Sequence, residues 1–408
     1  MNMKKYNMRT APFILNRFLS LKVFSFLLIA NLNLSVNAQN NNLPNDSISV
    51  VSFSFVGDIM CHSTQFKYAK VKEDSFDFKP TYKFIRPIFS GYDFNFGNLE
   101  TVFAGNQIKY TGYPLFNTPD DFLGGLKYAG FDYLFTANNH AFDRFEKGVR
   151  RTKKIVKYNY METVGTNLSG NSKKYLIVEK NNISVAVLAF SFGINGFEMP
   201  EGKEYLVNLI DKEEISKQIK NVKNENPDLI LVYFHFGNEY SKEPSAYQKD
   251  IVKFTIKRGA DVIIASHPHV MQPVEFFKTK NGNLDTGFVA YSLGNFISNQ
   301  RWRYSDASVM LGFEIEKNLI SKKVKLKKLS FLPLWVYKGE YEGKPQYIVF
   351  PSEIAFYAER IPNLSENDWS MMKESYEDTK SIIMKRTDKI KLLRLKELFP
   401  IDKIVINF

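Results

Sequence analysis

The chain has 408 residues, a formal net charge of +12 and a single cysteine, Cys61. One cysteine excludes an internal disulfide, so burial of apolar side chains must stabilise the fold, and the length is ample for that. Without the five basic residues among the first 22 positions the net charge falls from +12 to a mild +7, and no basic stripe interleaved with aromatic residues favours a nucleic-acid partner.

Residues 1–38 have the pattern of a secretion signal. Basic residues without acids precede an apolar stretch at 23–30, and small residues at 36–38 suit cleavage. An uncleaved N-terminal anchor is the alternative interpretation. Residues 39–48 are rich in Asn and predict a linker. We therefore expect an exported protein of the periplasm or the cell surface.

Apolar runs alternate with amphipathic segments between residues 49 and 269. The runs predict strands at 49–56, 92–97, 133–137, 183–192, 229–234 and 261–265. The segments between them predict helices at 82–89, 118–129, 142–158, 212–225 and 247–258, whereas 67–79 predicts a surface loop. This order is typical of an α/β fold.

The pattern changes after residue 269. Alternation at 309–315 and 323–335 predicts antiparallel strands, which we expect in a second sheet packed on the first. Residues 353–398 are charged and predict helices without catalytic residues. We therefore expect one domain at 49–340 and a mostly helical extension at 341–408.

All five histidines stand at or just beyond the end of a predicted strand: His62, His140, His235, His267 and His269. An acid or an amide accompanies them at Asp58, Glu100 and Asn139. Because the carboxyl ends of parallel strands meet at one rim of a sheet, we expect these side chains to converge. A single histidine is more often a hydrogen-bonded core or loop residue; the set of five argues for metal binding.

Imidazole and carboxylate groups suit Zn, Mn and Fe(II). The candidate ligands are Asp58, His62, Glu100, Asn139, His235, His267 and His269. They exceed what one tetrahedral ion needs, so we expect two divalent ions bridged by a carboxylate, an arrangement that catalyses phosphoryl and similar transfers. Cys61 stands beside this set and is either a packing residue or a redox-sensitive thiol.

Six short segments resemble, in the same order, those of the CapA family of bacterial capsule-synthesis proteins, which are associated with poly-γ-glutamate. The segments lie at 57–60, 97–100, 137–140, 235–240, 266–273 and 292–296, and the resemblance spans about residues 50–334. That family is similar to the calcineurin-like metallophosphoesterases. The resemblance implies a four-layer αββα sandwich of two mixed sheets with a C-terminal helical appendage.

The resemblance also implies roles for individual residues. Asp58, His62 and His269 would hold a first metal, Glu100 would bridge, and Asn139, His235 and His267 would hold a second. His140 would be the catalytic acid or base, with Asp58 also in the catalytic set, and Asn98, Glu239 and Asn295 would support the ligands or contact substrate. Asp58 and His62 are four residues apart, where the phosphoesterases have a spacing of two.

These implications lead to one expected function and two alternatives. The expected function is metal-dependent hydrolysis during synthesis, anchoring or trimming of an anionic envelope polymer such as poly-γ-glutamate. A metal-activated water would attack an amide or a phosphoester, and membrane-bound capsule synthesis or export proteins are the expected partners. The alternatives are a polymer-binding assembly protein without turnover and a phosphoesterase acting on a small substrate.

Overall fold

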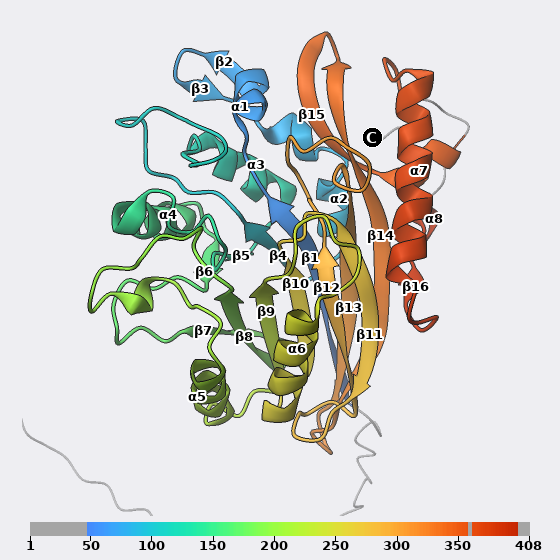
Figure 1. The fold of residues 1–408 in the computed structure, drawn as a ribbon. Coiled ribbons are helices and arrows are strands. Elements are labelled where there is room, and N and C mark those ends of the chain that lie inside the picture. The colour runs from blue at the N-terminus through green and yellow to red at the C-terminus, as the bar shows by residue number, and fades with distance from the viewer. Residues whose placement is uncertain (1–46, 358–360, 399–408) are drawn as a thin grey trace, which may run out of the picture. The chain divides into compact units, whose positions relative to one another are not determined.

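Two mixed β-sheets stacked face to face form the centre of the fold (Figure 1). The computed structural model describes residues 47–357 and 361–398. The predicted signal segment and nearly all of the predicted linker lie outside these residues. No helix within the described ranges is both long enough and apolar enough to cross a membrane.

The first sheet has the order β15-β14-β13-β1-β4-β5-β6, with β16 paired to β14. Its pairs from β1 to β6 are parallel, and those from β1 to β15 are antiparallel. The strands are β1 (Ile48–Ile59), β4 (Phe94–Leu99), β5 (Tyr133–Phe135), β6 (Glu162–Val164), β13 (Ala307–Asn318), β14 (Val324–Tyr341), β15 (Lys344–Pro351) and β16 (Lys391–Leu392).

The second sheet has the order β11-β12-β10-β9-β8-β7. Its four inner strands are parallel, and the outer strands β7 and β11 are antiparallel to their neighbours. The strands are β7 (Tyr175–Lys180), β8 (Ile183–Ser191), β9 (Leu229–His235), β10 (Val262–Ser266), β11 (Met271–Lys278) and β12 (Thr286–Leu293). Of the strands in the two sheets, β6, β7, β11, β15 and β16 were not predicted from the sequence, and the last two lie in the part expected to be mostly helical.

Aromatic side chains fill the space between the sheets. Phe53 and Phe55 are two positions apart on β1, so both lie on the face toward this interior, where Phe55 stacks on Phe96. The rings of Phe135 and Tyr233 join the two sheets, with centroids 4.0 Å apart. Because side chains alternate along a strand, β1 presents its phenylalanines to the second sheet.

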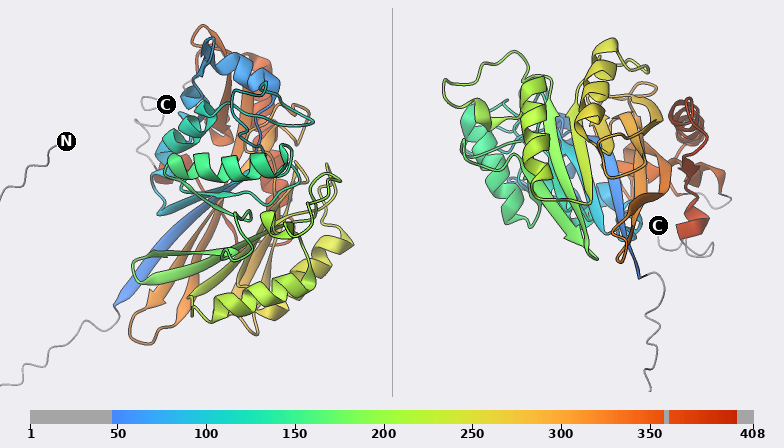
Figure 2. Two further views of the ribbon diagram at one scale, coloured as in Figure 1. Left: turned by 90° about the vertical axis from the view of Figure 1, so that its left-hand side faces the viewer. Right: turned by 90° about the horizontal axis from the view of Figure 1, so that it is seen from below.

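Helices cover the outer face of each sheet, so the predicted αββα sandwich is confirmed (Figure 2). The first sheet is covered by α2 (Arg86–Phe89), α3 (Asp121–Ala129) and α4 (Phe145–Tyr158), and the second by α5 (Lys212–Lys223) and α6 (Ala246–Arg258). Gly130 and Gly259 end α3 and α6 with φ of 109° and 114°, a left-handed conformation in which glycine is least strained.

Two local predictions were wrong. The expected loop at 67–79 contains the end of α1 (Ser63–Ala69) and the hairpin of β2 (Lys70–Lys72) and β3 (Ser75–Phe76). The helix predicted at 118–129 starts later, because α3 begins at Asp121 and the Thr118 hydroxyl lies 2.6 Å from that of Thr101.

The strands at the C-terminal end of the chain belong to the first sheet, not to the second as predicted. β13 pairs antiparallel with β1, so Phe313 lies opposite Phe53. The predicted boundary after residue 340 falls inside β14, and β15 continues the same sheet. Helix α7 (Glu366–Ile383) then runs along β14 (Figure 1) and also contacts β11, with Trp369 and Met372 buried. The short α8 (Leu395–Leu398) follows β16.

Candidate metal centre

The ends of four parallel strands bring the candidate ligands together. Asp58 lies at the end of β1, Asn98 at the end of β4, and His235 at the end of β9, while His267 and His269 follow β10. A register shift between Val56 and Asp58 marks a β-bulge at Gly57. Such a bulge changes the direction of the next side chain, and it places Asp58 among the other ligands.

Two carboxylates are fully buried in this cluster, those of Asp58 and Glu100. The Nδ2 group of Asn98 donates to Asp58 Oδ1 at 2.8 Å and to Glu100 Oε2 at 3.3 Å. Glu100 Oε1 has no hydrogen-bond partner. Among the described residues no lysine or arginine pairs with either carboxylate. Because an uncompensated buried charge is costly, the pair calls for a cation.

Burial shifts the pKa values of this cluster in opposite directions. It raises the pKa of Glu100 well above its ordinary value, and the charge of Asp58 adds to the rise. It lowers the pKa of His235 well below the usual range, and it lowers that of His267 to about 3, with His269 contributing in the same sense. His235 and His267 are therefore neutral at pH 7, which is the form that binds metals.

Glu100 belongs to two groups of potential ligands. One contains Glu100, His267 and His269, and the other contains Asp58, Glu100 and His235; within each group the ligand atoms lie within 4.8 Å of one another. Glu100 Oε1 lies 3.7 Å from His235 Nε2 and 3.9 Å from His269 Nε2. Two atoms that each lie about 2.1 Å from one ion are at most about 4.2 Å apart. Both distances are therefore short enough for Glu100 to share an ion with His235 and another with His269.

His269 is oriented by two acceptors. Its Nδ1 lies 3.1 Å from Asp58 Oδ2 and 3.0 Å from Asn295 Oδ1, so Nδ1 carries the proton and donates. Nε2 therefore keeps its lone pair, as a metal ligand requires. The backbone turns sharply here, with φ of 107° at His267 and 59° at His269, a strain typical of functional sites.

Asn139 and His235 also lie together, with Asn139 Oδ1 2.8 Å from His235 Nε2. The Nδ2 group of Asn139 donates to Asn195 Oδ1 at 3.0 Å, which fixes the amide. His235 Nδ1 lies 3.2 Å from Asn98 Nδ2. Asn139 is thus placed as an oxygen ligand beside the imidazole of His235.

His62 and Glu239 lie apart from both groups. His62 stands at the N-terminus of α1, its Nδ1 accepts from the Asn299 backbone N–H at 3.2 Å, and burial lowers its pKa to about 4. Glu239 is exposed in the loop after β9. Of the residues that the resemblance implies around the first metal, Asp58 and His269 lie together, with His269 Nδ1 3.1 Å from Asp58 Oδ2, and His62 belongs to neither ligand group.

His140 forms a separate pair with Asp143. His140 Nδ1 lies 2.8 Å from Asp143 Oδ2, and that oxygen also accepts from the Phe116 backbone N–H at 2.8 Å. Both side chains are buried, and neither belongs to the two ligand groups. The carboxylate orients the ring so that Nε2 is the nitrogen able to exchange a proton with a substrate.

A family model described as bacterial capsule synthesis protein PGA_cap matches residues 52–300, more than half of the chain. The chain belongs to this family. The six segments that suggested the CapA resemblance all lie within the matched range.

Two relatives of this PGA_cap chain carry related names. The PGA biosynthesis protein CapA of Bacillus subtilis (strain 168) is 28% identical over 276 residues, which cover 67% of this chain and 70% of that protein. The capsule biosynthesis protein CapA of Bacillus anthracis is 27% identical over 276 residues, which cover 66% of this chain and 64% of that protein. The chain thus spans less than two thirds of the second relative.

Solved structures similar to this PGA_cap chain are more distant. The NAD nucleotidase of Haemophilus influenzae has a TM-score of 0.46 and 15% identity, covering 88% of this chain and 59% of its own. The calcineurin-like phosphoesterase YfkN of Bacillus subtilis has a TM-score of 0.41 and 14% identity, covering 81% of this chain and 98% of its own. At these scores neither bears on the chemistry of the present site.

Sequence reasoning missed two residues of the PGA_cap site. Asp143 follows His140 by three positions, and that spacing within one loop was a signal for the pair. Asn195 lies in the loop after β8; its Oδ1 accepts from Asn139, and its Nδ2 lies 3.3 Å from His140 Nδ1. Nothing in the local sequence singles out Asn195, because its partners lie more than 50 residues away.

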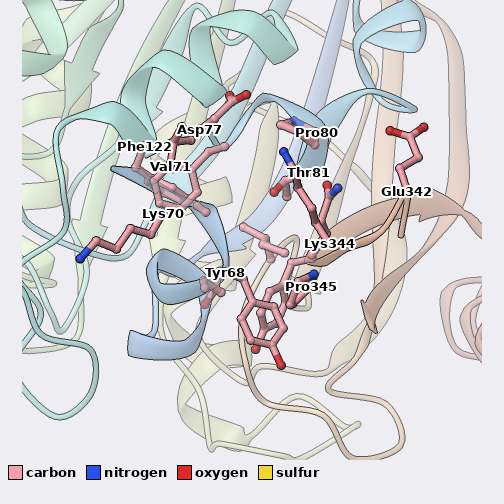
Figure 3. A pocket seen from close by; sticks show the side chains of 16 residues that line it. Tyr68, Lys70, Val71, Asp77, Pro80, Thr81, Phe122, Glu342, Lys344 and Pro345 are labelled. Atoms are coloured by element: carbon pink, nitrogen blue, oxygen red, sulfur yellow. The ribbon is translucent and has the colours of Figure 1, made fainter. Parts of the chain in front are cut away.

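A separate cavity of about 390 Å³ lies beside α1 (Figure 3). Its lining includes Tyr68 and Gln65 of α1, Thr81, and Lys344 and Tyr347 of β15. Gln65 connects this cavity to His62, because Gln65 Oε1 accepts from the His62 backbone N–H at 2.7 Å. The metal ligands themselves do not line it.

Proposed function

We propose that this chain is an exported, metal-dependent hydrolase that cleaves an anionic capsular polymer such as poly-γ-glutamate. The observation that carries the proposal is the position of Glu100, a buried carboxylate shared by two groups of ligands and without a lysine or arginine partner in the described chain. A divalent ion held there polarises a carbonyl or phosphoryl oxygen and makes bound water more acidic.

The side chains around Glu100 orient the ligands and transfer a proton in this proposal. Asp58 and Asn295 hold the ring of His269, and Asn98 holds both carboxylates through its amide group. His140 stands outside the ligand groups and is therefore available to give its Nε2 proton to the leaving amine, while Asp143 keeps Nδ1 protonated. We assign proton transfer to His140 and positioning to Asp143 and Asn195.

The names of the two CapA relatives support a capsular polymer as substrate. The secretion pattern of residues 1–38 supports action in the periplasm or at the cell surface, where such a polymer is handled. Membrane-bound capsule synthesis or export proteins are the partners we propose. Two ions of Mn, Zn or Fe match the nitrogen and oxygen ligands.

The test combines elemental analysis of the purified chain with two assays on metal-loaded protein. One assay follows the size of poly-γ-glutamate and the release of amines, and the other follows hydrolysis of an aryl phosphate. Metal binding with polymer cleavage supports the proposal. Aryl phosphate hydrolysis alone makes the chain a phosphoesterase, and bound metal with polymer binding but no turnover makes it an assembly protein.

A further inference from the structure

Lys338 and Arg301 are cationic side chains without an ion-pair partner in the described part of the chain. Lys338 of β14 is half-buried, and its Nζ donates to Asn299 Oδ1 at 3.0 Å. Arg301 is also half-buried, and its Nη1 is a buried donor without any hydrogen-bond partner. The other four lysines of β13 and β14 all form ion pairs, such as Lys325 with Glu316.

The nearest acid does not neutralise Arg301. Asp306 acts on it electrostatically but not at ion-pair distance, and the Asp306 carboxylate instead accepts from Trp335 Nε1 at 3.0 Å. The guanidinium of Arg301 lies 5.5 Å from the centroid of the Trp335 ring. Burial lowers the pKa of Arg301 and the charges of Asp306 and Asp368 act in the opposite direction, so the guanidinium stays charged and is compensated only at a distance.

Both cations act on one tyrosine, and Lys338 is also linked to His62. Lys338 Nζ lies 5.6 Å from the ring centroid of Tyr347, whose hydroxyl also donates to Asn299 Oδ1, and the charge of Arg301 acts on the same hydroxyl. The backbone N–H of Asn299 donates to His62 Nδ1 at 3.2 Å. Asn299 therefore connects Lys338 to His62.

We propose that Lys338 is a carboxylate-binding residue close to His62 that holds a free carboxylate of the polymer, and that Arg301 adds positive charge behind it. This subsite at Lys338 rests on the proposed function, because it names the part of the substrate that would be recognised. An ammonium has three donors, and one of those on Lys338 contacts Asn299, so others remain for a ligand. A carboxylate on the Lys338 ammonium would accept a charge-assisted hydrogen bond, which is stronger than a neutral one.

The test measures equilibrium binding of a γ-linked glutamate tetramer to the full metal-loaded chain. Lys338→Met is expected to weaken binding about tenfold or more, because a hydrogen bond to a charged group is lost. Lys338→Arg keeps the charge and is expected to retain most of the affinity. Lys220→Met on the exposed face of α5 removes the same charge far from the subsite and is expected to bind as the wild type does. Metal content and thermal stability of each variant establish that it is folded.

A second probe separates recognition of carboxylates from a structural role. A tetramer whose free carboxylates are converted to amides is expected to bind weakly to the wild type and no more weakly to Lys338→Met. Equal losses for both tetramers, unchanged binding by Lys338→Met, or no binding by the wild type would each overturn the subsite. Binding without turnover would instead reject hydrolysis while leaving the subsite in place.

Discussion

His140 Nδ1 lies 2.8 Å from Asp143 Oδ2, inside the protein and outside both groups of metal ligands. We predict that His140→Ala abolishes turnover and leaves the metal content near that of the wild type, because the ring transfers a proton and binds no ion. Elemental analysis and the polymer assay on the same preparation test this. Loss of metal in the variant would make His140 a ligand.

The same geometry predicts an effect of Asp143→Asn. The amide cannot hold the imidazole in the required tautomer, so kcat is expected to fall by about 10²–10⁴-fold with little change in KM or metal content. Asp250→Asn on the exposed face of α6 is the matched control and should not change kcat. A drop confined to KM would contradict the positioning role.

Glu100→Gln should remove metal binding and, with it, stabilisation by metal. At a free metal concentration of 100 times Kd, binding stabilises the folded state by about 2.7 kcal/mol, so a chelator should lower the Tm of the wild type. The Tm of Glu100→Gln should not respond to the chelator. Without metal this variant should be at least as stable as the wild type, because it lacks a buried charge. A variant that keeps its metal would rule out Glu100 as the shared ligand.

Gly57→Ala should disrupt the bulge that orients Asp58. A Cβ atom at position 57 would lie 1.8 Å from the Gly294 carbonyl oxygen, so the backbone of one strand must move. We expect a loss of about 3 kcal/mol in the free energy of unfolding, together with loss of metal. Gly124→Ala is the control: nothing lies within 4 Å of its Cβ, and helix propensity should raise stability by about 0.5–1 kcal/mol.

Asp261 should make stability depend on pH between about 4 and 6. Burial raises its pKa from 3.8 to about 6, although the backbone N–H groups of Leu284, Ile230 and Asn283 donate to it. The folded state binds the proton more tightly than the unfolded state, so this contribution is complete below pH 3.8 and disappears as the pH rises through 6. It amounts to at most about 3 kcal/mol.

Denaturant unfolding of the wild type and of Asp261→Asn, both with a chelator present and from pH 4 to pH 7, isolates the contribution of Asp261 to the free energy of unfolding. The wild type should lose stability relative to the variant as the pH rises, because the asparagine does not titrate. A difference between the two proteins that stays constant with pH would exclude the raised pKa.

Cys61 should be chemically inert in the folded protein. Its side chain is fully buried, and burial raises the pKa of the thiol far above its ordinary value, so almost no thiolate forms. We expect no reaction with a disulfide reagent until denaturant is added, and then one thiol per chain. Rapid reaction of the native protein would restore the interpretation as a redox-sensitive thiol.

Local patterns in the sequence were enough to predict the alternation of strands and helices and the position of every histidine near a strand end, whereas the four-layer class came from the family resemblance. The first two features are local, because apolar periodicity and flanking Gly, Asn and Pro depend on neighbouring residues. The same local signals predicted that Asp58, Glu100, His235, His267 and His269 stand at strand ends.

Only the tertiary structure decided which side chains meet. It joined β13 to β1 rather than to a second sheet, separated His62 from the ligand groups, and brought Asn195 to His140 and Asn139 across more than 50 residues. Alternation along a strand predicts which of its faces is apolar, but it does not predict which strand is its neighbour in the sheet. The bulge at Gly57 and the turns at His267 and His269 set side-chain directions through backbone angles that contacts with distant strands impose.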